Sequence, residues 1–304
     1  MDLFELETFL AVARQKTFSG AAQQMHRTQP AVSQTIKKLE DELGEMLFDR
    51  SSRGGKLTDA GIMLEDYAQK LLNLRGETQQ ALVELRQLQR GKLCVAANEF
   101  TALYLLQVLD EYRKLHPMIR VAVQRSLASN IPHELLNHNV ELGIVSFRPD
   151  DARLRSIVVY RDELAFIVHP QHPLARSKTV SIKQLGAEIF VAHNVSSPYR
   201  AKVLQAFQRH KTPLNMDVEL PTIEAIKRFV AMGNGVALVP ATAITREINT
   251  GELVHISVRE LAFERKLRMV YRKGATFSHA AKAFLQVVQA TARKRGGRFL
   301  WQPD

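Results

Sequence analysis

Residues 17–43 contain two short helical patterns separated by only a few residues, and this spacing constrains the fold more than any other feature. The first pattern, FSGAAQQM, has small residues at 20–22, where a second helix can cross it closely. After a turn at 26–29, the pattern QPAVSQTIKKLEDEL begins behind Thr28, which is suited to cap a helix, and it has a proline in its first turn. This arrangement predicts a helix-turn-helix.

The segments on either side extend this unit. Apolar residues spaced three and four apart over 3–14 predict a preceding helix. After the pattern, an apolar run at 46–48 and the pair Gly54-Gly55 predict a small hairpin, or wing. Residues 1–58 are therefore predicted to form a winged helix-turn-helix, an architecture that binds DNA.

A long helix is predicted from its cap, Thr58, to about residue 88, so that residues 59–89 link two domains. Its side chains spaced alternately four and three apart form a heptad seam, which two polar positions weaken. This helix could pack on its own domain or pair with another copy of the chain; the second is favoured because no partner segment lies nearby. The seam consists of Leu64, Ala68, Leu71, Arg75, Thr78, Leu82 and Leu85.

Strand-like and helix-like segments alternate from Gly91 onward, which predicts βαβ units and an α/β fold with a largely parallel sheet. The pattern restarts after Arg161, and a late strand, KLRMVYRK, returns. We therefore predict a two-lobed domain at 90–304, with a ligand cleft at the strand ends. Lobe I would comprise residues 90–162 and 267–304, and lobe II residues 163–266.

The formal net charge of +11 suggests a protein that binds nucleic acid. The positive charge is not concentrated in the predicted DNA-binding domain, however. Residues 1–90 hold 12 Lys+Arg and 13 Asp+Glu, a net charge of −1, whereas residues 259–304 carry +8. DNA binding must therefore depend on the placement of a few bases. The basic residues near the C-terminus are typical of a solvated helix end, with an auxiliary DNA or subunit contact as the alternative.

Several classes of protein are disfavoured by motif. The single cysteine, Cys94, cannot form an intrachain disulfide, and the scattered histidines lack metal-ligand spacing, so no metal site is expected. We find no nucleophile elbow, phosphate-binding loop or dinucleotide fingerprint, so we do not expect an enzyme. No apolar run is long enough for a membrane span, and the first residues lack the bases of a signal peptide, so a cytoplasmic protein is expected.

The sequence resembles the LysR-type transcriptional regulators over nearly its whole length. The resemblance is carried by LETFLAVARQKTFSGAAQQMHRTQPAVSQTIKKLEDELGEMLFDR, followed by LTDAG, then HPLA at 172–175 and VAMGNGVALVP at 230–240. It implies a dimerising linker helix and a two-lobed effector domain like that of periplasmic binding proteins. It also implies a homotetramer that binds promoter DNA and, as an activator, contacts RNA polymerase.

The resemblance places DNA contacts at the start of the third helix and on the wing. Gln29 and Ser33 are suited to base edges, and Lys37 is suited to phosphate. Many relatives carry arginine where this chain has Gln34. The predicted DNA-binding residues are Gln29, Pro30, Ser33, Gln34, Lys37, Arg50 and Arg53.

The resemblance also places an effector between the lobes, on loops that follow strands. Each Ser or Thr there could instead be a plain helix cap. A polar pocket of this kind suits a small organic acid, and no other cofactor is expected. Glu99 is expected to point away or to pair with a base. The predicted effector-binding residues are Asn98, Phe100, Thr101, Ser146, Phe147, Ser196, Ser197 and Thr222.

We therefore expect a ligand-responsive, sequence-specific transcriptional regulator in which effector binding changes the oligomer geometry and the bend of promoter DNA. The alternative is a solute-binding protein or α/β enzyme with an accessory N-terminal domain.

Overall fold

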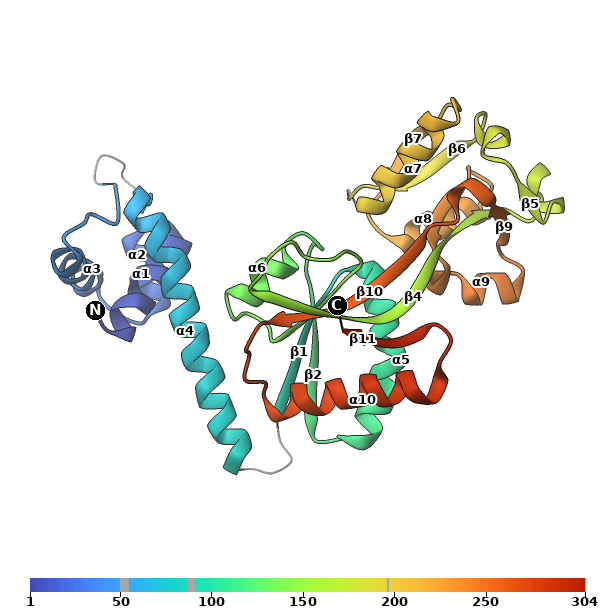
Figure 1. The fold of residues 1–304 in the computed structure, drawn as a ribbon. Helices are drawn as coiled ribbons and strands as arrows, with labels where there is room; N and C mark the ends of the chain where they lie inside the picture. The colour runs from blue at the N-terminus through green and yellow to red at the C-terminus, as the bar shows by residue number, and fades with distance from the viewer. Residues whose placement is uncertain (50–54, 87–90, 196, 304) are drawn as a thin grey trace. The chain divides into compact units, whose positions relative to one another are not determined.

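The computed structural model divides the chain into two compact units (Figure 1). Unit 1 comprises residues 1–88 and 133–140, and unit 2 comprises residues 89–132 and 141–304. The structure describes residues 1–49, 55–86, 91–195 and 197–303, without the side chains of residues 80, 81 and 84–86.

Unit 1 begins with the predicted helix-turn-helix. Asp2 and Glu5 form a reciprocal capping box on the first helix. Thr17 and Thr28 cap the next two helices, accepting hydrogen bonds from backbone N–H groups at 3.1 and 3.4 Å. Local capping thus defines all three helix starts. The helices of unit 1 are α1 (Leu3–Gln15), α2 (Phe18–Gln24), α3 (Gln29–Leu43) and α4 (Asp59–Arg86).

The structure shows the base of the predicted wing. Phe48 and Leu57 form an antiparallel bridge, and the Asp49 N–H donates to the Lys56 carbonyl at 2.8 Å. The buried Glu40 of α3 accepts the N–H of Leu47 at 2.8 Å, which ties this helix to the base of the wing. Gly54 of the predicted turn and the predicted Arg50 and Arg53 lie outside the described residues, whereas the Gly55 N–H donates to the Lys16 carbonyl at 2.8 Å.

The linker helix α4 has two different halves. Leu64, Ala68 and Leu72 pack on the core of the helix-turn-helix, as expected for a helix that covers its own domain. Beyond them, Leu74 and Leu82 are 46% and 54% exposed in the single chain. Of the predicted seam, Leu64 and Ala68 therefore pack on their own domain and Leu82 is exposed, while pairing with another copy of the chain stays a prediction.

Unit 2 is built on a mixed sheet with the strand order β2-β1-β3-β10-β4-β9-β5, with β8 and β11 also paired to β4. The strands are β1 (Gly91–Ala97), β2 (Ile119–Arg125), β3 (Leu142–Val145), β4 (Leu154–Val168), β5 (Thr179–Val180), β8 (Ala237–Pro240), β9 (Val254–Val258), β10 (Glu264–Arg272) and β11 (Phe299–Pro303). A separate pair joins β6 (Ile189–His193) to β7 (Asn215–Leu220).

Helices alternate with these strands along the chain, and residues 133–136 of one of them, α6, belong to unit 1. The α-helices are α5 (Glu99–Leu115), α6 (Ile131–Leu136), α7 (Pro198–Arg209), α8 (Ile223–Ala231), α9 (Thr245–Thr250) and α10 (His279–Arg295). Short 3-10 turns are η1 (Pro173–Arg176), η2 (Ile182–Leu185), η3 (Ala241–Ala243) and η4 (Arg259–Leu261).

The prediction of a largely parallel sheet is wrong, because β4 pairs antiparallel with β8, β9, β10 and β11. The strands β1, β2 and β3 are parallel, but β10 runs antiparallel to both β3 and β4. The reason is that β4 is one continuous strand of 15 residues, which leaves lobe I and enters lobe II without a break (Figure 1). Strand β10 returns beside it, so the two lobes share an antiparallel pair of strands.

Each lobe has its own core. One apolar cluster joins β1, β3 and the start of β4 to α5 and α10. Two others fill lobe II around the end of β4. Within the described residues, no helix has both the length and the apolar character to cross a membrane.

Candidate DNA interface and effector cavity

The start of α3 presents polar side chains to solvent. Val32 and Ile36 point into the core of unit 1, so the opposite face of the helix carries Gln29, Gln34 and Lys37 as exposed residues. Pro30 is also exposed, and Ser33 is half-buried. This amphipathic division leaves the predicted residues of α3 on one accessible side.

Two of these predicted residues contact each other. The Gln29 side-chain amide donates to the Ser33 hydroxyl at 3.1 Å, one helical turn away. Such a bond fixes the direction of the Gln29 amide, which must point correctly to pair with a base edge. The predicted Arg50 and Arg53 lie outside the described residues.

The neighbouring lysines of α3 differ. The Lys38 ammonium lies 2.7 Å from the buried Glu5 carboxylate, whose pKa is lowered by that hydrogen bond, while the pKa of Lys38 is raised by it. Lys37 is exposed and forms no ion pair among the described residues. Lys37 is therefore the lysine of this pair that remains available for a phosphate.

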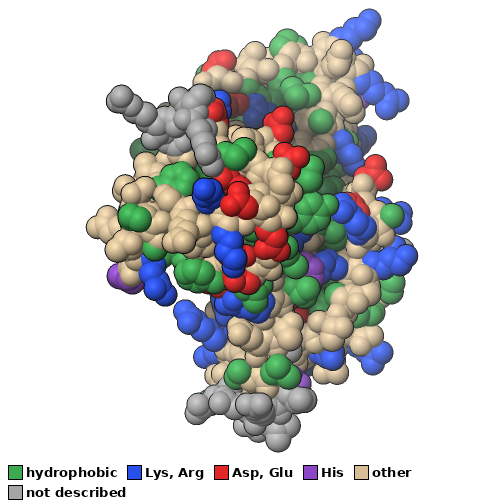
Figure 2. All heavy atoms as spheres, turned by 90° about the vertical axis from the view of Figure 1, so that its left-hand side faces the viewer, with side chains coloured by type: hydrophobic (Ala, Val, Ile, Leu, Met, Phe, Trp, Pro, Cys, Tyr) green, Lys and Arg blue, Asp and Glu red, His purple; other side chains and the backbone are tan. Residues whose placement is uncertain are grey.

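The surface of the side that faces the viewer in Figure 2 agrees with the charge count of the sequence. Lys and Arg side chains are interspersed there with Asp and Glu and do not form one continuous basic patch. The sequence of residues 1–90 likewise has no excess of bases, with a net charge of −1.

Unit 2 contains a cavity of about 560 Å³ between its two lobes. Five of the predicted effector residues line it: Asn98, Phe100, Ser146, Phe147 and Ser197. Two others do not. Thr101 is fully buried and donates its hydroxyl to the Ile144 carbonyl at 3.2 Å, and Thr222 caps α8 by accepting the Ala225 N–H at 3.1 Å. The predicted Ser196 lies outside the described residues.

Arginines that the sequence patterns did not single out also line the cavity. They are Arg125 at the end of β2, Arg200 on α7 and Arg265 on β10. Arg200 pairs with Glu219, whereas Arg125 forms no ion pair among the described residues. No short-range motif marks these positions, because three distant elements contribute them.

Arg265 is the most buried of these cations. Its side chain is 4% exposed and lies 2.7 Å from the Asp162 carboxylate, which is fully buried on the neighbouring strand β4. Its guanidinium also lies over the Phe100 and Tyr199 rings, 5.9 and 5.7 Å from their centroids. Burial lowers the pKa of Arg265 and raises that of Asp162, because it penalises the charged form of each.

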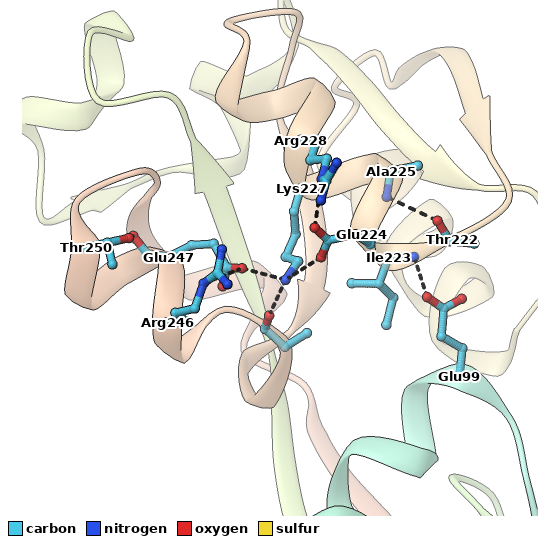
Figure 3. A network of polar contacts seen from close by, with 11 residues as sticks. Glu99, Thr222, Ile223, Glu224, Ala225, Lys227, Arg228, Arg246, Glu247 and Thr250 are labelled. Carbon is cyan, nitrogen blue, oxygen red and sulfur yellow. Dashed lines mark hydrogen bonds and ion pairs between the residues drawn. The ribbon is translucent and has the colours of Figure 1, made fainter.

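Three polar contacts join one lobe to the other beside the cavity. Glu99 of α5 accepts the Ile223 N–H of α8 at 2.8 Å (Figure 3). Its other oxygen lies 3.4 Å from His193 Nε2. The Tyr199 hydroxyl donates to the Ser146 carbonyl at 3.2 Å. Glu99 thus lines the cavity and pairs with histidine, and does not point away.

The described residues contain no group of three or more His, Cys, Asp and Glu side chains that could hold a metal ion. Cys94 is half-buried in β1, and burial raises the pKa of its thiol, which disfavours the reactive thiolate.

Comparison with protein families matches both parts of the chain. Residues 3–62 match the bacterial regulatory helix-turn-helix of the lysR family, and residues 86–293 match the LysR substrate binding domain. The chain is 32% identical over 94% of its length to a probable RuBisCO transcriptional regulator of Synechocystis, covering 85% of that protein. It is 28% identical to the RuBisCO operon transcriptional regulator of Allochromatium vinosum, over 97% of both chains.

Solved structures share the fold. CbnR in complex with its target DNA matches 96% of this chain and all of that chain, with a TM-score of 0.74 and 19% identity. The regulatory domain of Synechocystis CcmR in complex with 2-PG matches 66% of this chain and 97% of that domain, with a TM-score of 0.61 and 26% identity. With a winged helix-turn-helix, a linker helix and a two-lobed domain around a cavity, this chain belongs to the LysR family of transcriptional regulators.

Proposed function

We propose that this regulator responds to a small metabolite with an anionic group, bound in the cavity of unit 2. The observation that carries the proposal is Arg265, a nearly buried guanidinium on the cavity wall. Its ion pair with Asp162 accounts for one N–H donor, and because the guanidinium also lines the cavity, its other donors are available to an anionic group there. Arg125 at the end of β2 adds a cation without a competing carboxylate.

The chemistry of the cavity wall narrows the effector class. Phe100, Phe147 and Tyr199 supply apolar faces, while Asn98, Ser146 and Ser197 supply hydrogen-bonding groups. A carboxylated or phosphorylated compound of a few carbon atoms fits such a wall. The 2-PG bound by the CcmR domain belongs to this class. Relatives named as RuBisCO regulators suggest an operon of carbon fixation as the target.

The proposed DNA interface is the exposed side of α3. Gln29, oriented by Ser33, reads a base edge; Pro30 makes an apolar contact; and Lys37 binds a phosphate. Gln34 adds a polar group to the same side, and the wing supplies Arg50 and Arg53. These side chains would read one half-site, and a second copy of the chain would read the other.

The proposed assembly is a homodimer through α4, and a homotetramer of two such dimers. Support comes from the exposed leucines in the second half of this helix, which a partner helix would cover. The regulator would act in the cytoplasm, where promoter DNA lies, and would contact RNA polymerase if it activates. Effector binding would change the closure of the lobes, hence the spacing of the paired α3 helices and the bend of the DNA.

A combined experiment tests the proposal. Thermal unfolding of the full chain is followed with a panel of carboxylated and phosphorylated metabolites that includes 2-PG, and with a second panel of neutral and cationic metabolites. Members that raise Tm are then added to a gel shift on the intergenic DNA upstream of the gene. A bound effector should stabilise the protein and change its DNA complex. A Tm that responds only to neutral or cationic metabolites contradicts the anionic class.

A further inference from the structure

Arg265 contacts two aromatic side chains, one from each lobe. Its guanidinium lies 5.9 Å from the centre of the Phe100 ring, on α5 of lobe I, and 5.7 Å from the centre of the Tyr199 ring, on α7 of lobe II. The Phe100 ring in turn packs on the His193 ring of lobe II at 4.9 Å. The Tyr199 hydroxyl donates to the Ser146 carbonyl of lobe I at 3.2 Å. The arginine that carries the proposed function therefore contacts two residues that join the lobes.

The Tyr199 hydroxyl is in a setting where it remains a hydrogen-bond donor. Tyr199 is in the first turn of α7, behind the cap Ser197, and its side chain lines the cavity. Burial raises the pKa of its hydroxyl by more than the Arg265 charge and a backbone hydrogen bond from Lys266 lower it. A phenol with a raised pKa keeps its single proton at neutral pH, and here it donates that proton to the Ser146 carbonyl.

We propose that Tyr199 is the positioning residue that holds the two lobes closed beside Arg265, and that effector binding changes lobe closure through it. Its ring contacts the arginine and its hydroxyl contacts the opposite lobe. A shift of the guanidinium toward a bound anion therefore reaches the contact between the lobes through one side chain. This inference rests on the proposed function, since it names the contact on which the effector of the same cavity acts.

The first N–H of α8 provides a measurement of lobe opening. Ile223 is the first residue of this helix, so its N–H has no acceptor within the helix. It donates instead to the Glu99 carboxylate of lobe I at 2.8 Å (Figure 3). When the lobes separate, this N–H loses its acceptor and exchanges with water, so its exchange rate measures the population of the open form.

The first experiment compares hydrogen–deuterium exchange of the full chain with that of Tyr199→Phe, without an effector. The substitution keeps the ring beside Arg265 and removes the hydroxyl, so the closed form loses the donor to the Ser146 carbonyl. Loss of one neutral hydrogen bond changes an equilibrium by about two- to tenfold. Exchange of the Ile223 N–H, followed by mass spectrometry of overlapping peptides, should accelerate by that factor.

A matched control is Tyr112→Phe. The Tyr112 hydroxyl donates to the Ala280 carbonyl at 2.9 Å, and both residues lie in lobe I. The same chemical change within one lobe should leave the exchange of the Ile223 N–H as in the wild type. No acceleration in Tyr199→Phe, or an equal acceleration in both variants, overturns the proposal.

A second experiment adds 2-PG, or the anionic metabolite that raises Tm most. In the wild type the bound anion should change the exchange rate of the Ile223 N–H. In Tyr199→Phe calorimetry should still detect binding, because Arg265 is retained, but the change in exchange should be much smaller. An equal change in both proteins means that the effector acts through another contact, and it overturns the coupling.

The two experiments separate this inference from the proposed function. If no anionic metabolite binds either protein, the proposed effector class is wrong. The comparison without an effector then still decides whether Tyr199 holds the lobes together, since faster exchange in Tyr199→Phe alone supports that role and its absence overturns it.

Discussion

The α3 surface and the unit 2 cavity are assembled in opposite ways. On α3, the candidate residues occupy one side of a single helix within three turns, and their spacing alone brings them together. The cavity wall takes Glu99 from α5, His193 from β6 and Arg265 from β10. A contiguous site is visible in the sequence, whereas a discontinuous one depends on long-range pairing of strands.

The same difference determines how much each charged side chain contributes to binding or stability. Lys37 is exposed on α3 and has water as its alternative partner. Arg265 in the cavity wall has only Asp162, two aromatic rings and the cavity itself. Removal of an exposed charge changes affinity modestly, but removal of a buried one leaves its partner without compensation. The following predictions test this contrast.

The largest effect is expected for Arg265→Met. It leaves the fully buried Asp162 without its partner, so unit 2 should lose about 3–5 kcal/mol of its free energy of unfolding. The double variant Arg265→Met/Asp162→Leu should recover most of that loss, because no buried charge remains. Chemical denaturation of the full chain measures both. If the double variant is as unstable as the single one, the loss comes from packing of the guanidinium.

The pH dependence of this variant has a definite sign. Burial already raises the pKa of Asp162, and without Arg265 the pKa should rise further. A raised carboxyl pKa means that the folded state binds the proton more tightly, so stability falls as pH rises from the ordinary Asp value of about 4 through the folded pKa. The deficit of Arg265→Met should therefore shrink on acidification. A deficit independent of pH contradicts this account.

A smaller loss is expected at the C-terminal strand β11. The Phe299 ring packs edge-on against Tyr160 at 5.1 Å, and the Arg295 guanidinium lies over it at 5.0 Å. Phe299→Ala should cost about 2 kcal/mol of stability, which denaturation of the full chain measures. Arg293→Ala, an exposed control, should cost almost nothing. Equal effects would mean that the charge of this segment matters more than its packing.

Gln29→Ala tests the contiguous site. Loss of a bidentate contact to a base typically costs about 1–3 kcal/mol of discrimination at that base pair. The Gln29→Ala protein should bind the preferred operator less tightly. Its affinity for operators altered at the base pair that Gln29 contacts should change little. Binding to a panel of single-base operator variants measures this. If the order and spread of affinities stay as in the wild type, Gln29 does not read a base.

The smallest effect is expected for Lys37→Ala. It should weaken binding similarly for all sequences and lower the slope of log affinity against log salt by about one. Lys38→Ala is the matched control, because Lys38 is held by Glu5 at 2.7 Å and should change the slope less. Operator titrations at several salt concentrations compare the two. A larger change for Lys38 would reverse their assignment.

The helices of unit 1 could be predicted because their signals are local. A cap at Thr28, a proline behind it and small residues at 20–22 all lie within a few residues of the turn that they define. Strands β9 and β11 were not predicted. Each is five residues long. Strand β11 forms by pairing with β4, and no residue near β11 in the sequence indicates this pairing.

Only part of the cavity could be predicted, because only some of its residues have local sequence signals. Asn98 and Ser197 follow strands and cap helices, so their positions at strand ends could be inferred. Thr101 and Thr222 are also polar residues at helix starts, and neither lines the cavity; Thr101 is fully buried, with its hydroxyl bonded to the Ile144 carbonyl. The C-terminal bases were expected to be solvated, and they are exposed; Arg298 and Arg295 also form surface ion pairs with Glu163 and Glu111.

The strand pair β4–β10 has a consequence for synthesis of the chain. In lobe I, β3 has β1 on one side and β10 on the other, and β10 is made only after the whole of lobe II. The sheet of the first lobe therefore stays open at that edge while the second lobe emerges from the ribosome. An unpaired edge of this kind invites wrong pairing, so growing chains should depend on rapid folding of lobe II or on protection by chaperones.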